Sequence, residues 1–178
     1  MASSSYTHLS ISEAQAERLA FQHYGIRCQA RMLPGEVDFN FRLDTPNGAS
    51  YTLKLSRPGA DPKLLEMQAA VLKRLEKAAL PLQLPLPVAD RNGQLATSVQ
   101  DEHGHQRYIR LLHWVPGKVF AKASPHSPAL LESLGRACGQ LSRALEGFYH
   151  PAAERPFKWD PSGLPWVKEY EHLFKGQQ

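Results

Sequence analysis

Two short stretches of the chain alternate between apolar and polar residues. In FNFRLD (39–44) and YTLKLS (51–56) every second residue is apolar, which predicts two half-buried strands. The connecting residues PNG (46–48) fit a three-residue hairpin loop, in which a type I turn precedes a glycine in the left-handed conformation. The pattern therefore predicts an antiparallel hairpin with one apolar face.

The loop length also predicts the register of this hairpin. A three-residue loop pairs Thr45 with Ala49, and counting along the strands then places Asn40 opposite Lys54. Because side chains alternate between the two faces of a sheet, both polar residues lie on the face away from the apolar set. By itself this pattern makes Lys54 an ordinary solvated surface lysine.

Helix and turn signals organise the rest of the chain. Ser12 and Asp61 are candidate N-caps, Gly25 is a stop signal, and the helix after Ser127 has an apolar face on which Cys138 is expected to be buried. Helices are expected over 12–24, 61–79 and 127–147 and after Asp160-Pro161, and further strands over 27–33, 94–100 and 107–115. An antiparallel sheet with one helix therefore comes first and helices follow.

Composition narrows the class of protein. The 178 residues are 42% hydrophobic and 21% charged, as in soluble globular proteins. No apolar run approaches ~20 residues, and the first residues lack the features of a secretory signal, so we expect no membrane association. Cys28 and Cys138 have no metal-ligand or redox spacing, which favours a reducing, cytoplasmic location.

The positive charge is small and dispersed. The net charge is +4 and no basic run occurs, so we expect no nucleic-acid partner. A mildly basic surface suits a polyanionic small ligand such as a nucleotide equally well. The segment His103-Gly104-His105 has metal-like residues, but it sits in a predicted turn without further ligands, and we assign no metal site to it.

The order of elements changes the interpretation of Lys54. A glycine-containing loop, a hairpin, a strand lysine, a helix and two more strands follow one another as in the N-terminal lobe of a kinase. The segments LPGEVDFNFRL, YTLKLS, LLEMQAAVLKRL, RYIRLLHWVPG and LGRACGQLSRALEGFYHP resemble the aminoglycoside phosphotransferase-like family of small-molecule kinases. Within that family they are most similar to the hydroxylysine kinases and to the kinase-like domains fused to class III aminotransferases.

This resemblance implies an α+β, protein-kinase-like fold. Residues 1–115 would form a nucleotide-binding N-terminal lobe with an antiparallel sheet of about five strands and one helix. Residues 116–125 would be the linker, and residues 126–178 the first helices of the C-terminal lobe.

The resemblance also implies roles for individual residues. Lys54 matches the phosphate-binding lysine, Asn40 the asparagine that begins the strand after the nucleotide loop, and Gly35 that loop. His113 and Val115 match the linker positions whose backbone C=O and N–H bind adenine. Leu112 would line the adenine pocket.

The helix partner of Lys54 departs from the family pattern. The family pairs its lysine with a helix glutamate, but a helical wheel places Glu66 on the solvated face of the helix. Gln68 falls at the family position and points inward, and its amide can accept a hydrogen bond from an ammonium group. We therefore expect Gln68 to position Lys54, with Glu66 as the second choice.

The catalytic motifs of the family do not occur in the sequence. No His-Gly-Asp motif is present, so we expect an N-terminal piece of a longer kinase that binds ATP, with Mg²⁺ held only by the missing half. The intact protein would phosphorylate a hydroxyl of an amino-acid-like or amino-sugar substrate, and the 178-residue chain alone would be inactive. Which acceptor it uses, and whether it uses ATP or GTP, stay open.

Two alternatives remain. The chain could be a non-catalytic nucleotide-binding or interaction module, and uncovered apolar helix surface leaves room for self-association. A generic α+β nucleic-acid binder is the third and weakest interpretation, because it needs a continuous basic face.

Overall fold

A six-stranded antiparallel sheet is the centre of the fold. The computed structural model describes residues 11–155 and 160–174. The strand order is β1-β2-β3-β6-β4, with β5 also paired to β6. The strands are β1 (Gln29–Leu33), β2 (Phe39–Asp44), β3 (Ser50–Leu55), β4 (Pro87–Val88), β5 (Thr97–Gln100) and β6 (Gln106–His113).

The β2–β3 hairpin has the predicted register. Asn40 pairs with Lys54, the Thr45 amide donates to the Ala49 carbonyl at 2.9 Å, and Gly48 has φ +85°. A β-carbon is disfavoured at this φ, which is why a glycine ends the turn. The prediction from turn chemistry and alternation is therefore confirmed.

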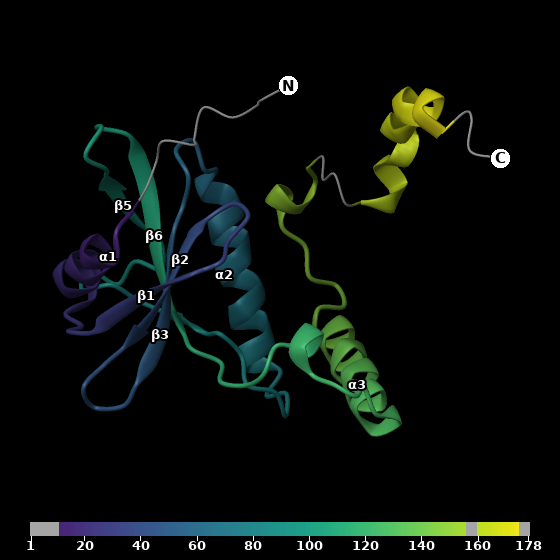
Figure 1. The fold of residues 1–178 in the computed structure, drawn as a ribbon, viewed down its shortest axis with the longest axis horizontal. Coiled ribbons are helices and arrows are strands. Elements are labelled where there is room, and N and C mark those ends of the chain that lie inside the picture. Colours follow the sequence, from purple (N-terminus) through teal and green to yellow (C-terminus); the bar gives the residue numbers. More distant parts are fainter. Residues whose placement is uncertain (1–10, 156–159, 175–178) are drawn as a thin grey trace. The chain divides into compact units, whose positions relative to one another are not determined.

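Helices cover the two faces of the sheet, as Figure 1 shows for α1 and α2. The helix α1 (Glu13–Leu19) begins with a capping box made by Ser12 and Gln15 and continues as the π-helical turn η1 (Ala20–Tyr24). The helix α2 (Pro62–Lys77) begins at Asp61, whose side chain accepts from the Lys63 amide. Both N-caps were predicted, because side-chain oxygens satisfy the free amides of a first turn.

The hydrophobic core lies between the sheet and α1. Phe41, Leu43, Leu53 and Leu111 are fully buried there, together with Ala16 and Ala20 of the helix. The opposite face of the same strands carries the polar set that includes Asn40 and Lys54. This division of the faces leaves the polar set on the side of α2.

The strand β4 and its pairing with β6 were not predicted. Val88 pairs with Leu111, and Pro87 with Leu112. The segment LPLQLPLPV (80–88) does alternate, but its prolines lack the amide donors of a strand, so its place beside β6 depends on tertiary contacts. The sheet therefore has six strands where about five were expected.

The segment after β6 is helical, as predicted. It contains η2 (Phe120–Lys122), α3 (Pro128–Ala144), η3 (Pro151–Ala153) and the 3₁₀ helix η4 (Pro161–Phe174). Ser127 caps α3 by accepting from the Leu130 amide. The chain divides into two compact units between Phe148 and Tyr149, and the division proposed at residues 116–125 stays a prediction.

The expectation that Cys138 is buried was wrong. Cys138 is exposed, and α3 contains no buried residue. Leu131 and Leu134 are also exposed, at 50% and 43%. An amphipathic pattern predicts a helix that could be covered, but it does not say that a partner covers it.

In the described part of the chain, no helix is both long enough and apolar enough to cross a membrane.

Candidate functional site

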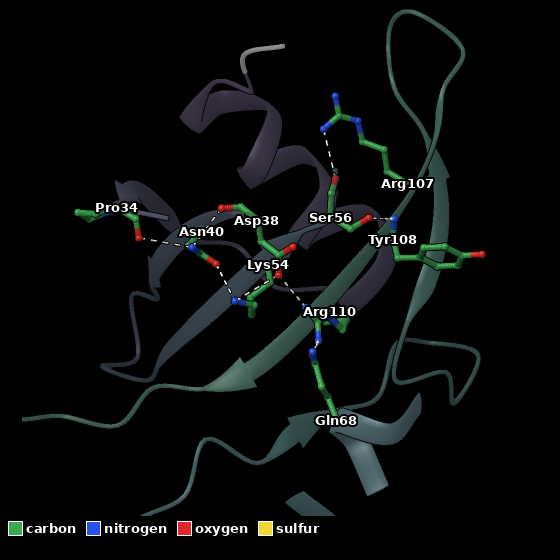
Figure 2. Close-up of polar contacts among 9 residues, drawn as sticks. All are labelled: Pro34, Asp38, Asn40, Lys54, Ser56, Gln68, Arg107, Tyr108 and Arg110. Carbon is green, nitrogen blue, oxygen red and sulfur yellow. Dashed lines mark hydrogen bonds and ion pairs between the residues drawn. The ribbon is translucent and has the colours of Figure 1, made fainter. Parts of the chain in front are cut away.

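Lys54 lies at the centre of a polar cluster on the α2 side of the sheet (Figure 2). Its Nζ donates to Asn40 Oδ1 at 3.0 Å and lies 3.3 Å from Asp38 Oδ2. The Lys54 side chain is 27% exposed, so it is not closed off from solvent. Strand β3 therefore presents a partly open cation on the face that the sequence predicted.

Asn40 connects this cation to the β1–β2 loop. Its Nδ2 donates to the carbonyls of Pro34 at 3.4 Å and Asp38 at 3.2 Å. A β-carbon on Gly35 would lie 2.3 Å from both Asn40 Nδ2 and the Asp38 carbonyl. The loop can fold this closely onto Asn40 only because residue 35 has no side chain.

Arg110 of β6 is the second cation of the cluster. It pairs directly with Lys54 in the sheet register, and its Nη2 donates to Asp38 Oδ2 at 2.8 Å. Burial lowers the pKa of Arg110, and the Asp38 carboxylate partly offsets that effect. The Arg110 Nε is the buried side-chain atom without a hydrogen-bond partner among the described residues.

The predicted pairing of Lys54 with Gln68 was wrong. Gln68 points inward as predicted, but its Oε1 accepts from Arg110 Nη1, while Lys54 interacts with Asn40 and Asp38. Arg110 lies opposite Lys54 on β6, and its guanidinium donates the hydrogen bond to Gln68 that was expected from Lys54. Glu66 is exposed, in agreement with the solvated-face interpretation.

A pocket of about 350 Å³ extends from Lys54 along the inner side of α2. Its walls include Gln68 and Arg110, and Leu112 closes the β6 side. The other lining residues are mainly apolar and include Leu65, Leu72 and Pro87. An apolar cleft with a few convergent polar groups is the usual form of a small-molecule site.

The predicted linker residues lie at the end of β6. The His113 amide donates to the Leu86 carbonyl at 2.9 Å, and the Trp114 amide donates to the Ser50 carbonyl at 3.1 Å. Val115 is exposed. The structure thus brings Gly35, Asn40 and Lys54 together and places Gln68 and Leu112 on the pocket, whereas His113 and Val115 do not line it.

A second polar cluster supports β6 from its other face, and Figure 2 draws its members Arg107, Ser56 and Tyr108. Arg107 is buried and forms an ion pair with Asp101 at 2.7 Å. The Tyr108 amide donates to Ser56 Oγ at 2.8 Å. Burial acts to raise the pKa of Asp101, but hydrogen bonds from the His105 amide and the Arg107 guanidinium outweigh it and lower the pKa to about 2.

The described residues do not fit a metal ion. Over 11–155 and 160–174, no group of three or more His, Cys, Asp or Glu side chains could hold one.

The family to which this site belongs follows from comparison with known proteins. The profile of the phosphotransferase enzyme family matches residues 29–177, which is most of the chain. The chain belongs to this phosphotransferase enzyme family. The matched region includes the β1–β2 loop, Lys54, α2 and the end of β6.

Relatives of this phosphotransferase family member are kinases of small molecules. Mouse hydroxylysine kinase is 29% identical over 174 residues, a match that covers 89% of this chain and 46% of the kinase. The chain thus spans about half the length of that relative.

Two solved structures share the fold. The amicoumacin kinase hAmiN, solved with AMP-PNP, Ca²⁺ and Ami, has a TM-score of 0.69 and 16% identity over 89% of this chain and 48% of that chain. A microcompartment-associated aminopropanol kinase has a TM-score of 0.63 and 20% identity over 84% of this chain and 45% of that chain. The predicted kinase-like α+β fold is confirmed.

Sequence reasoning missed Asp38 and Arg110. Asp38 is visible as a charged residue directly before the predicted strand FNFRLD, and Arg110 interrupts the run RYIRLL as Lys54 interrupts YTLKLS. Extending the hairpin register to a third strand would have placed Arg110 opposite Lys54, but no local signal gives the register of β6 on β3.

Proposed function

We propose that this chain is the nucleotide-binding part of an ATP-dependent phosphotransferase that acts on a hydroxyl of an amino-acid-like or amino-sugar substrate. The observation that carries the proposal is the partly open ammonium group of Lys54, held by Asn40 beneath the β1–β2 loop. In kinases a strand lysine in this place binds the nucleotide phosphates.

The proposed roles follow the family pattern. Lys54 contacts the phosphates, Asn40 holds Lys54 and the loop, and Gly35 lets the loop approach. Leu112 lines the adenine pocket, and the His113 carbonyl and Val115 amide bind the adenine edge. Gln68 acts on this site through Arg110 rather than on Lys54 directly.

The names of the relatives support the substrate class. Hydroxylysine and aminopropanol each carry a hydroxyl and an amine, and the amicoumacin kinase was solved with a nucleotide analogue. We propose residues 1–115 as the nucleotide-binding lobe, residues 116–125 as the linker and residues 126–178 as the start of a helical lobe. Without a His-Gly-Asp motif in its sequence, the 178-residue chain alone is proposed to transfer no phosphate.

Calorimetric titration of AMP-PNP into the 178-residue chain tests nucleotide binding. Lys54→Met is expected to weaken binding about tenfold or more, because a charge-assisted contact to phosphate is lost. Lys73→Met, which removes an exposed lysine from α2, is the matched control and should bind as the wild type does. Equal affinity of the Lys54 and Lys73 variants would contradict the proposal.

A phosphorylation assay with hydroxylysine and simple amino alcohols tests the proposed inactivity of the 178-residue chain. No product is expected from this chain alone. Turnover by the purified chain would show that it carries a complete catalytic site and would overturn the proposed inactivity.

A further inference from the structure

Asp38 is shared by two cations. A single oxygen, Oδ2, lies 3.3 Å from Lys54 Nζ and 2.8 Å from Arg110 Nη2. The side chains of Arg110 and Asp38 are 9% and 16% exposed, and that of Lys54 is 27% exposed. Arg110 and Asp38 thus form the buried end of the cluster, and Lys54 forms its open end.

The sheet register makes this carboxylate necessary. Lys54 and Arg110 are direct cross-strand partners on the same face, and like charges in such positions repel one another. One shared carboxylate adds two attractions that offset this repulsion, and it leaves the cluster with a net positive charge. Without it, the hydrogen bond to Asn40 would be left to hold the ammonium of Lys54 against the repulsion by Arg110.

Arg110 also connects the cluster to α2. Its Nη1 donates to Gln68 Oε1, while Nη2 holds Asp38. In kinases, a helix carboxylate contacts the strand lysine directly. Here the helix supplies an amide, the β1–β2 loop supplies the carboxylate, and Arg110 bridges the two.

We propose that Asp38 positions Lys54 together with Asn40, and that Arg110 and Gln68 couple the Asp38 contact to α2. For nucleotide binding, the inference rests on the proposed function. Its consequence is that the position of Lys54 depends on the β1–β2 loop, which Asn40 holds at Pro34 and Asp38 and which Arg57 holds at the Glu36 carbonyl, at 2.7 Å.

The first experiment measures the position of Lys54 without any nucleotide. An amine-reactive ester labels the chain, and mass spectrometry gives the rate at Lys54. Asp38→Asn is expected to raise that rate several-fold, Asp38→Glu to restore it in part, and Gln68→Ala to raise it less than Asp38→Asn. An unchanged rate in Asp38→Asn overturns the proposal.

Asp44→Asn is the matched control for this experiment. Asp44 is a carboxylate at the far end of β2 that contacts Arg42 at 2.8 Å, Arg31 and Ser50, so its loss should leave the labelling of Lys54 unchanged. Circular dichroism establishes that each variant is folded. Gln68→Ala leaves both charges of the Asp38–Arg110 pair in place. If Asp38→Asn does not fold, the labelling rate of Lys54 in Gln68→Ala provides a second measurement.

The second experiment compares AMP-PNP with adenosine, which has no phosphates. Asp38→Asn should weaken AMP-PNP binding about tenfold, as expected for the loss of one charge-assisted contact, and leave adenosine binding unchanged. The double variant Asp38→Asn/Lys54→Met should bind AMP-PNP no more weakly than Lys54→Met, because both changes remove the same contact.

The outcomes separate the two proposals. If the wild type binds no AMP-PNP, the proposed function fails and the labelling experiment still decides the role of Asp38. If Asp38→Asn binds AMP-PNP more tightly than the wild type does, Asp38 competes with phosphate and the positioning role is overturned.

Discussion

Asn40 accepts a hydrogen bond from Lys54 at 3.0 Å across the β2–β3 ladder, and the same side chain donates to the backbone of the preceding loop. One amide thus uses both of its ends, the oxygen for the cation and the nitrogen for the loop. The loop and the cation therefore share one support.

Asn40→Ala is expected to release both Lys54 and the β1–β2 loop. It should lower the free energy of unfolding by about 1–2 kcal/mol, the usual net worth of such hydrogen bonds, and raise hydrogen exchange in the loop at residues 35–38. Gln106→Ala is the control, because it removes an exposed cross-strand amide contact to Ser98 at 3.0 Å. Equal loop exchange in the Asn40 variant and the wild type would contradict the shared support.

Gly35→Ala is expected to displace the loop. The added β-carbon would lie 2.3 Å from Asn40 Nδ2 and from a backbone carbonyl, and backbone cannot move aside as a flexible side chain can. We expect destabilisation of about 1–3 kcal/mol, as for other overpacking substitutions, measured by urea unfolding.

A glycine in α3, Gly135, is expected to tolerate the substitution that Gly35 does not. Gly135 has no heavy atom within 4 Å of an added β-carbon and lies inside a helix. Gly135→Ala should therefore be neutral or stabilise the chain by up to about 1 kcal/mol through helix propensity. A Gly35 variant as stable as the Gly135 variant would show that the loop is not tightly packed on Asn40.

The sequence predicted what depends on neighbours in the chain. The β2–β3 register followed from a turn of fixed length and a period of two, and the helix starts at Ser12, Asp61 and Ser127 followed from capping chemistry. These signals involve only residues close together in the chain, so the sequence alone is enough to detect them.

Long-range contacts could not be predicted in this way. A helical wheel correctly turned Gln68 inward, but it could not say whether Lys54 or Arg110 would meet it. Loop residue Asp38 belongs to no periodic pattern, and α3 has an apolar face that the structure leaves exposed. In each case the contact depends on a residue of another helix, strand or loop. A local sequence pattern does not tell where that element lies.

The two cysteines are expected to differ in reactivity. Cys138 is exposed, whereas Cys28 is half-buried and burial, with Glu17 and Asp44 nearby, raises the pKa of its thiol. Because the thiolate is the reactive form, iodoacetamide at pH 8 should alkylate Cys138 several-fold faster than Cys28. Mass spectrometry of the timed reaction gives both rates, and faster alkylation of Cys28 would contradict the exposure of α3.

The low pKa of Asp101, which pairs with Arg107, is expected to make the free energy of unfolding depend on pH. The pKa of Asp101 falls from 3.8 to about 2 on folding, so the folded state binds its proton more weakly than the unfolded state. The stabilisation is fully present above about pH 5 and is lost as the pH falls from about 4 through 2. It amounts to about 2–3 kcal/mol on the conversion of pKa shifts into free energy.

Urea unfolding of the wild type and Asp101→Asn between pH 2 and pH 7 measures this contribution. At pH 7 the variant should be less stable by about 2–3 kcal/mol, because the buried Arg107 loses its carboxylate, and the difference should shrink as the pH falls from 4 to 2. Glu132→Gln is the control: it breaks a pair with Arg136 whose side chains are 72% and 67% exposed, and such a surface pair contributes at most about 0.5 kcal/mol. A stability difference between the wild type and Asp101→Asn that stays constant from pH 7 to pH 2 would mean that the ionisation of Asp101 does not stabilise the fold.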